Sequence, residues 1–310
     1  MICQDCHRRC GVERSDDTAG GICLSPLLPR VVRAAPHYGE EPCLSGSHGA
    51  GTIFFSGCNL RCVFCQNHEI SRRSVGRTVT VQELRAVMLA LRDSGVHNIE
   101  LVTPTHFTRV IARALDGLNL GIPVVWNSSA YETVETLRML EGLVQVYLPD
   151  LKYWRNDTAK RYSAAADYPE VARAAIEEMF RQCGAYRMDG DGILQRGVMI
   201  RHLILPEHSE ESMDIIDYVA DCFPPGSVLF SLMSQYTPMP GLDRFPELQM
   251  PITAEENANL VHYMKSRNLQ DGFWQEVDSV GMENIPQFDG SDLDILPALS
   301  DNKDGFTTQS

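Results

Sequence analysis

Short apolar runs alternate with amphipathic stretches along most of the chain. Runs that are rich in Val, Ile and Phe and bounded by turn residues predict strands at 52–55, 99–102, 123–126, 144–148, 198–205 and 228–232. Apolar residues recur at helical spacing in the stretches 81–94, 107–118, 132–140, 170–183, 209–222 and 254–266. Six repeats of strand and helix are typical of a parallel sheet covered by helices. Since a full eight-unit barrel needs a longer chain, we predict an α/β fold, an incomplete (β/α)6 barrel.

The regularity of this pattern divides the chain into three parts. Residues 1–48 are rich in Cys, Gly and Pro and have weak periodicity, which is typical of a small metal-binding segment. The barrel is expected over residues 49–284. Residues 285–310 are rich in Asp, Ser and Gly, so we expect an acidic, mobile tail.

Composition narrows the classes of partner. Of the 310 residues, 44% are apolar, which is enough to build a large core. The net charge of −14 disfavours binding to nucleic acids and anionic membranes, because an acidic surface repels phosphate groups. The N-terminus lacks the apolar core of a signal peptide, and no run approaches the roughly 20 apolar residues of a membrane helix. We therefore expect a cytoplasmic protein with no nucleic-acid or membrane partner.

The distribution of cysteines indicates metal chemistry. Eight of the ten cysteines lie within the first 65 residues, and clustered cysteines in a reducing cytosol suggest metal ligation. Three of them, Cys58, Cys62 and Cys65, have the spacing C-x3-C-x2-C directly after the first predicted strand. Three thiolates on one loop can bind three corners of a cubane iron–sulfur cluster and leave the fourth iron open. Zinc is the alternative, with His68 as a fourth ligand.

A second group of cysteines lies near the N-terminus, with the spacing C-x2-C-x3-C-x12-C. Its members are Cys3, Cys6, Cys10 and Cys23. The spacing supports structural zinc and an auxiliary iron–sulfur cluster equally. An irregular segment of this size has little core of its own, which favours a bound metal over free thiols.

The three-cysteine motif resembles that of a known superfamily. Its spacing, with the aromatic Phe64 directly before the third cysteine, is similar to that of the radical S-adenosylmethionine superfamily. Other segments resemble homologues of pyruvate formate-lyase activating enzyme: CQDCHRRCGV at 3–12, GEEP at 39–42, GTIFFSGC at 51–58, LVTPTH at 101–106, YLPDLK at 147–152 and MSQY at 233–236. This resemblance extends from Cys3 to about Gln275.

The resemblance implies a chemistry and its cofactors. It implies a [4Fe-4S] cluster held by Cys58, Cys62 and Cys65, with S-adenosylmethionine bound to the open iron. One electron from a flavodoxin- or ferredoxin-like donor would cleave S-adenosylmethionine to a 5′-deoxyadenosyl radical, which abstracts hydrogen from a substrate. The activase resemblance implies that this substrate is a glycine in a glycyl radical enzyme. A small molecule or another polypeptide is the alternative substrate, and a non-catalytic iron–sulfur or zinc protein is the alternative class.

Residues that support the cofactor are expected at the carboxyl ends of the strands, where barrel enzymes bind their ligands. Thr103, Thr105 and His106 follow the second strand, where many relatives carry a Gly-Gly-Glu that contacts the methionine amino group. Hydroxyl groups and a helix N-terminus could replace those contacts. The same residues also suit a simple helix cap.

The later strands supply further candidates. Asn127 and Ser128 follow the third strand and Arg201 interrupts the fifth, so we expect them to bind the cofactor. Asp150 and Lys152 follow the fourth strand, in a segment similar to the Leu-Asp-Leu-Lys of the activase. Asp150 would hold a monovalent cation or bond the substrate, although it could also cap the next segment. We predict both residues to be catalytic, because an Asp and a Lys are costly to bury there without a role.

Overall fold

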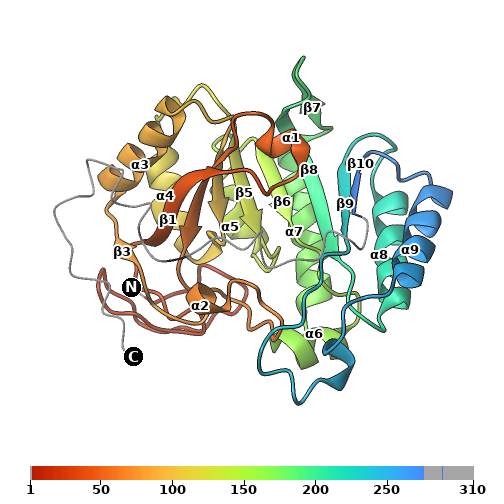
Figure 1. The fold of residues 1–310 in the computed structure, drawn as a ribbon. Helices are drawn as coiled ribbons and strands as arrows, with labels where there is room; N and C mark the ends of the chain where they lie inside the picture. The colour runs from red at the N-terminus through yellow and green to blue at the C-terminus, as the bar shows by residue number, and fades with distance from the viewer. Residues whose placement is uncertain (1, 276–287, 289–310) are drawn as a thin grey trace.

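One twisted sheet forms the centre of the molecule (Figure 1). The computed structural model describes residues 2–275 and residue 288. The strands in that part of the chain are β1 (Arg30–His37), β2 (Ala50–Phe55), β3 (Arg77–Thr78), β4 (Ile99–Val102), β5 (Val124–Ser128), β6 (Val146–Pro149), β7 (Arg187–Met188), β8 (Leu194–Leu203), β9 (Leu229–Met233) and β10 (Gly272–Trp274). They lie in the order β10-β9-β8-β6-β5-β4-β2-β1-β3, and the short β7 pairs with β8.

The parallel part of the sheet is an open, incomplete barrel. The neighbours from β2 through β4, β5, β6, β8 and β9 to β10 all run parallel. The six predicted strands are confirmed as β2, β4, β5, β6, β8 and β9. Within the described residues, β3 and β10 lie at opposite ends of the strand order and do not pair, so the barrel does not close.

The sheet also extends beyond the predicted strands. β1 runs antiparallel to β2, so the sheet begins at Arg30, ahead of the boundary that we expected at residue 48. Arg and Pro residues interrupt the apolar pattern of β1 and hide it in the sequence, and β10 has only three residues. The predicted tail, 285–310, lies outside the described residues except for Phe288, whose ring centroid is 5.4 Å from that of Phe54.

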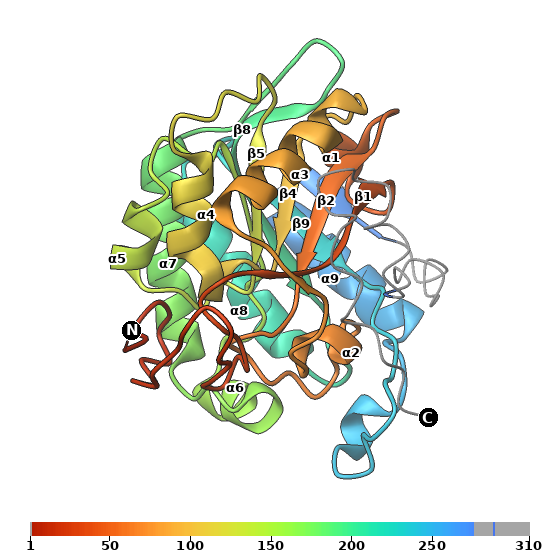
Figure 2. The same cartoon turned by 90° about the vertical axis from the view of Figure 1, so that its left-hand side faces the viewer.

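Helices cover the outer face of the sheet (Figures 1 and 2). The described helices are α1 (Pro42–Ser45), α2 (His68–Ser71), α3 (Val81–Asp93), α4 (Thr108–Leu115), α5 (Val134–Arg138), α6 (Asn156–Ser163), α7 (Tyr168–Cys183), α8 (Ser209–Cys222) and α9 (Ala254–Ser266), with 3-10 turns at Thr105–Phe107 and Pro246–Leu248. Capping boxes begin α3 at Thr80 and Glu83, and α9 at Thr253 and Glu256. The six predicted helical stretches are confirmed as α3, α4, α5, α7, α8 and α9. None of the described helices combines the length and the apolarity that crossing a bilayer requires.

Side chains on each strand alternate between the outer core and the inner face. On β5, Val124 and Trp126 belong to the main core, whereas Val125 belongs to a second, smaller cluster. That inner cluster includes Cys43 and Leu44 of α1. Figure 1 shows α1 at the end of the sheet opposite α2 and α6. Because α1 fills the inner face near the N-terminal ends of the strands, the polar residues nearer the C-terminal ends remain to line a cavity.

The N-terminal segment packs against the other end of the barrel, beside α2 and α6 (Figure 2). Arg8 Nε donates to the carbonyl of Asn59 at 2.8 Å, and its Nη2 donates to the carbonyl of Ser163 at 3.2 Å. Conversely, Arg61 on the cysteine loop donates to the carbonyl of Ile22 in the N-terminal segment. The segment is thereby fixed directly against the loop that carries the three-cysteine motif.

Candidate active site

A cavity of about 250 Å³ lies where the parallel strands end. The three cysteines of the C-x3-C-x2-C motif line it. Six of the eight residues predicted to bind the cofactor or to act in catalysis also line it: Thr103, Asn127, Ser128, Asp150, Lys152 and Arg201. The fold therefore brings side chains from the ends of β4, β5 and β6, and from the inner face of β8, to the cysteine loop.

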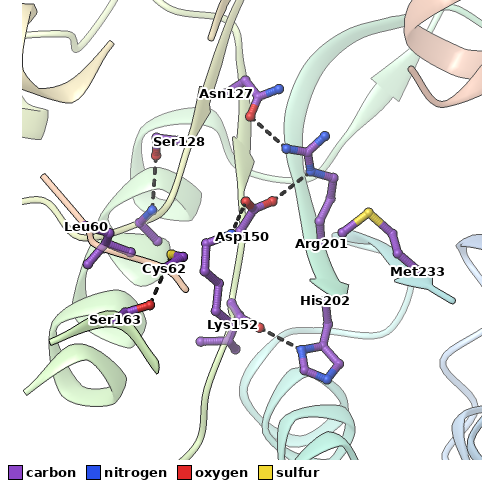
Figure 3. Close-up of polar contacts among 12 residues, drawn as sticks. Leu60, Cys62, Asn127, Ser128, Asp150, Lys152, Ser163, Arg201, His202 and Met233 are labelled. Atoms are coloured by element: carbon purple, nitrogen blue, oxygen red, sulfur yellow. Dashed lines mark hydrogen bonds and ion pairs between the residues drawn. The ribbon is translucent and has the colours of Figure 1, made fainter. Parts of the chain in front are cut away.

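The motif cysteines lie on the loop that leaves β2, and neighbouring groups contact all three of their sulfur atoms, with Cys65 Sγ 3.4 Å from Ser71 Oγ. Cys58 Sγ accepts a hydrogen bond from the backbone N–H of Leu60 at 3.4 Å. Ser163 Oγ, at the end of α6, donates to Cys62 Sγ at 3.0 Å (Figure 3). Cys65 completes the group on the cavity wall. Hydrogen bonds of this kind orient thiolate ligands and tune the metal that they bind.

The chemistry of these thiols fits an iron–sulfur cluster. All three are free of disulfide bonds. Burial raises the pKa of Cys58 to about 12, and burial together with the neighbouring Cys62 raises the pKa of Cys65. Buried thiols keep their protons until a metal displaces them. Three such thiols on one loop, facing one cavity, match the ligand set of a [4Fe-4S] cluster with one open iron.

A glycine allows the N-terminal segment to approach this loop. Gly57, directly before Cys58, has φ of +82°, a conformation that favours glycine. A Cβ atom at Gly57 would lie 2.2 Å from the carbonyl oxygen of Cys23 and 2.4 Å from Ser25 Oγ. The residue type at position 57 is therefore fixed both by its backbone conformation and by the packing of a distant part of the chain.

The four N-terminal cysteines lie in this same packed segment. Cys3, Cys6 and Cys23 are buried and Cys10 is exposed. Burial, followed by the proximity of Cys23 and Cys3, raises the pKa of Cys6 to about 12. Across the described residues, no three His, Cys, Asp or Glu side chains are already grouped around the position of a single metal ion.

A network of largely buried ion pairs forms the wall of the cavity beside the cysteine loop (Figure 3). Lys152 Nζ lies 2.6 Å from Asp150 Oδ2, and Arg201 Nε lies 2.9 Å from Asp150 Oδ1. Arg201 continues the network, because its Nη2 donates to Asn127 Oδ1 at 2.7 Å and its Nη1 donates to Glu40 Oε2 at 3.2 Å. One guanidinium thus links strands β5, β6 and β8 to the segment that follows β1.

The network keeps its central groups charged. Burial alone would raise the pKa of Asp150, but Arg201 and Lys152 outweigh burial and lower it. Burial would likewise lower the pKa of Lys152, but Asp150, aided by the nearby Cys62, raises it. Asp150 and Lys152 are therefore a stable ion pair on the cavity wall, beside the cysteine loop.

Two carboxylic acids of this network were not among the predicted site residues. Glu100, on β4, is fully buried, and its Oε1 accepts from Asn127 Nδ2 at 2.6 Å. Glu40 lines the cavity and binds Arg201. The sequence contained a signal for Glu100, since it is a charged residue inside an apolar strand. Glu40 lies in the GEEP segment that resembles the activase homologues, but this resemblance assigned it no role. Its role depends on how the segment after β1 folds back onto the barrel.

Of the three predicted residues that follow β4, one lines the cavity and two lie in the layer behind it. Thr103 lines the cavity with φ of +58°, an uncommon conformation for a β-branched residue that is typical of functional sites. Thr105 and His106 do not line it. Thr105 Oγ1 donates to Glu132 at 2.9 Å, and His106 Nε2 lies 2.8 Å from the carbonyl oxygen of Ser56. Thr105 and His106 thus contact residues that support the wall.

Other polar groups near the site have structural partners. Glu132 also accepts from Ser128 Oγ at 3.0 Å, which fixes that hydroxyl at the cavity edge. His202 follows Arg201 on β8 and so faces the outer side, where its ring nitrogens lie 2.8 Å from the Leu151 carbonyl and 2.8 Å from Ser212 Oγ. Burial lowers the pKa of His202 to about 4, which keeps its ring neutral.

Known proteins resemble this chain in sequence and in fold. An uncharacterized protein of Methanocaldococcus jannaschii, MJ0674, is 31% identical over 280 residues, which cover 86% of this chain and 75% of that protein. Streptococcus suis SuiB bound to S-adenosylmethionine has a similar structure at 13% identity, with a TM-score of 0.49. That match covers 71% of this chain but only 48% of SuiB. Methylornithine synthase (PylB) matches at 15% identity with a TM-score of 0.44, over 73% of this chain and 70% of that one.

The sequence also matches the profile of a protein family, over a region that contains the cysteine loop and most of the barrel. The profile of the Radical SAM superfamily matches residues 52–219, more than half of the chain. The match includes Cys58, Cys62 and Cys65 together with Asp150 and Arg201. This chain belongs to the radical SAM superfamily.

Proposed function

We propose that this protein is an enzyme that reductively cleaves S-adenosylmethionine to a 5′-deoxyadenosyl radical, which takes a hydrogen atom from a substrate in the cavity. One observation carries the proposal. Three free cysteines of a single C-x3-C-x2-C loop line a cavity together with polar side chains from four parallel strands. A protein that only stored or transferred electrons would not need such a cavity beside its cysteines.

The cysteine loop would hold the cofactor. Cys58, Cys62 and Cys65 would be the three protein ligands of a [4Fe-4S] cluster. When bound, the cluster would supply one electron and an open iron for the amino and carboxylate groups of S-adenosylmethionine. Ser163, which donates to Cys62 Sγ, would stabilise negative charge on that ligand.

The other wall would bind and orient the reactants. Thr103, Asn127 and Ser128 present polar groups at the strand ends, and we assign them to S-adenosylmethionine together with Arg201. Asp150 and Lys152 are assigned to the reacting centre, because they are charged, buried and beside the cysteine loop.

Thr105 and His106 would act indirectly, as positioning residues. Thr105 holds Glu132, which in turn holds the Ser128 hydroxyl. His106 holds the carbonyl of Ser56, two residues before Cys58. Their contribution would therefore be the placement of the wall and of the cysteine loop.

The first test is an anaerobic cleavage assay. The protein is reconstituted with iron and sulfide, S-adenosylmethionine and dithionite are added, and 5′-deoxyadenosine is quantified. We expect product from the wild type and none when Cys58, Cys62 and Cys65 are all replaced by Ala. A matched double variant, Cys183→Ala with Cys222→Ala, removes cysteines outside the site and should retain the activity. A reducible, fully loaded cluster whose electron paramagnetic resonance spectrum does not change with S-adenosylmethionine would contradict the proposal.

For the substrate, we propose the α-hydrogen of a glycine in a partner glycyl radical enzyme, with a flavodoxin- or ferredoxin-like electron donor. The similarity of residues 148–152 to the activase segment supports this choice. A small molecule or another polypeptide is the second candidate, because Thr103, Pro104 and Thr105 replace the Gly-Gly-Glu of many relatives. Mass spectrometry with deuterium-labelled candidates distinguishes them, since only the true substrate transfers deuterium to 5′-deoxyadenosine.

We also propose that Cys3, Cys6, Cys10 and Cys23 hold zinc or a second iron–sulfur cluster. Supporting this, three of the four thiols are buried in one short segment, and two of them raise the pKa of the third. A metal there would neutralise thiolates that burial otherwise disfavours.

A further inference from the structure

Three carboxyl groups lie near one guanidinium, that of Arg201, which lines the cavity. Glu40, Glu41 and Glu100 all interact electrostatically with Arg201, and we call these three residues the acidic floor. Arg201 also binds Asp150, whose second oxygen is paired with an ammonium group at 2.6 Å. One guanidinium is thus shared between Asp150 and the three carboxyl groups of the acidic floor, so the carboxyl groups of the floor outnumber the positive charge that faces them.

Glu100 carries a buried atom with unused hydrogen-bonding capacity. Its side chain is 0% exposed, and Oε2 has no hydrogen-bond partner among the described residues. In the register between β2 and β4, Phe54 is opposite Val102, and both line the cavity. Glu100 lies two residues before Val102 and so faces the same side of the sheet. An unpaired buried carboxyl oxygen is costly, and its position on this face points to a missing ligand.

Glu40 reaches the same place from a different part of the chain. Residues 38–41, which we call the strap, connect β1 to α1 near the N-terminal ends of the parallel strands (Figure 1). The Glu40 side chain is only 12% exposed and lines the cavity. The strap therefore adds a buried carboxylate to a barrel whose own strands already provide Glu100.

We propose that the acidic floor binds an ammonium or guanidinium group of the substrate, with Glu40 and Glu100 as its hydrogen-bond acceptors. This inference rests on the proposed function, because it places the substrate in the same cavity. Glu100 lies about 7 Å along β4 from Val102, toward the N-terminal end of the strand. A cation on the floor would therefore lie deeper than S-adenosylmethionine bound at the cysteine loop.

The electrostatics of the floor favour a cation over an anion or a neutral group. Burial, followed by the proximity of Glu40, raises the pKa of Glu100 well above its usual range. Burial also raises the pKa of Glu40, to about 7. At neutral pH, Glu100 thus keeps a proton, which offsets part of the excess negative charge of the floor. A substrate cation would take the place of that proton and would satisfy Oε2 as well.

The test compares small probes that differ in charge and little in size. Nuclear magnetic resonance titrations measure the affinity of the reconstituted, unreduced protein, saturated with S-adenosylmethionine, for n-butylammonium, n-butylguanidinium and n-butanol. We expect at least one of the two cations to bind tenfold or more tightly than butanol. Glu40→Gln and Glu100→Gln should each weaken binding of that cation about tenfold and leave butanol unaffected.

Glu178→Gln is the matched control, because Glu178 is also a buried carboxylate paired with an arginine but lies on α7, outside the cavity. Its affinities should equal those of the wild type. Equal affinities for cations and butanol would overturn the inference, as would unchanged affinities in both floor variants. Binding of the cation to protein without S-adenosylmethionine, but not to the saturated protein, would also overturn it, because the floor would then belong to the cofactor site.

The inference and the proposed function can fail separately. Cleavage of S-adenosylmethionine by a wild type that shows no preference for cations overturns the inference alone. A preference for cations that is lost in the floor variants, in a wild type that yields no 5′-deoxyadenosine, supports the inference and contradicts the proposed radical chemistry.

Discussion

Gly57 is the residue at which the N-terminal segment comes closest to the cysteine loop. Its positive φ and its contact with the Cys23 carbonyl both exclude a side chain. We expect Gly57→Ala to lower the free energy of unfolding by more than about 1 kcal/mol and to lower the iron content after reconstitution. Gly95→Ala is the control, since Gly95 has φ of +90° but nothing within 4 Å of an added Cβ. Equal losses in urea unfolding would show that strain alone, and not the close contact, governs position 57.

Arg201 is the residue that holds the charged wall together. Its guanidinium binds Asp150, Asn127 and Glu40 at once, which the single ammonium of lysine cannot do. We expect Arg201→Lys to cost about 2 kcal/mol of stability in urea unfolding, because buried partners lose their hydrogen bonds. The half-exposed Arg155 pairs with Glu210, and Arg155→Lys should change stability by no more than about 0.5 kcal/mol. Similar losses in the two variants would mean that the buried network does not stabilise the fold.

At the scale of elements, the sequence predicted what depends on local periodicity. The six inner strands and the six outer helices follow from apolar runs and helical spacing, because buried strands and amphipathic helices must show those patterns. The cysteine loop and most residues at the strand ends were placed by the rule that barrel ligands come from those ends.

What the sequence could not show depends on packing between distant segments. Strand β1 forms because the chain folds back and pairs with β2. Glu40 reaches the site because the segment after β1 comes close to Arg201 on β8. Thr105 and His106 are separated from the cavity by a turn whose direction is set at Thr103. On β8, the side chains of the neighbouring residues Arg201 and His202 face opposite sides, Arg201 toward the cavity and His202 toward α8.

The burial of His202 between β8 and α8 predicts a response to acid. Its pKa falls from 6.5 to about 4 in the folded protein, so the unfolded chain binds more protons between these values. The contribution of His202 to the free energy of unfolding is therefore full above pH 6.5 and is lost as the pH falls toward 4. The difference is about 3 kcal/mol. We expect His202→Gln to flatten the decline of urea stability between pH 7 and pH 4.5. His262→Gln, at an exposed position on α9, should leave the decline unchanged, and an unchanged decline in both variants would contradict the assignment.

At the scale of the whole molecule, the N-terminal segment connects two sets of cysteines. Arg8 and Arg61 fix it against the cysteine loop. If the N-terminal thiols hold a metal, anaerobically purified protein should contain zinc or additional iron. Replacing Cys3, Cys6 and Cys23 with Ser should then remove that metal in elemental analysis and lower the midpoint of thermal unfolding. Cys183→Ser, outside both groups, is the control, and an unchanged metal content in the triple variant would contradict the prediction.

The strap has a consequence for how such a protein can diverge. It lies outside the repeated strand–helix units, yet it adds Glu40 to the lining of the cavity. A change in its length or sequence would alter the groups beneath the reactants without disturbing the cysteine loop or any parallel strand. Descendants of one ancestor could therefore acquire new substrates by exchanging four residues, while inheriting the radical chemistry intact.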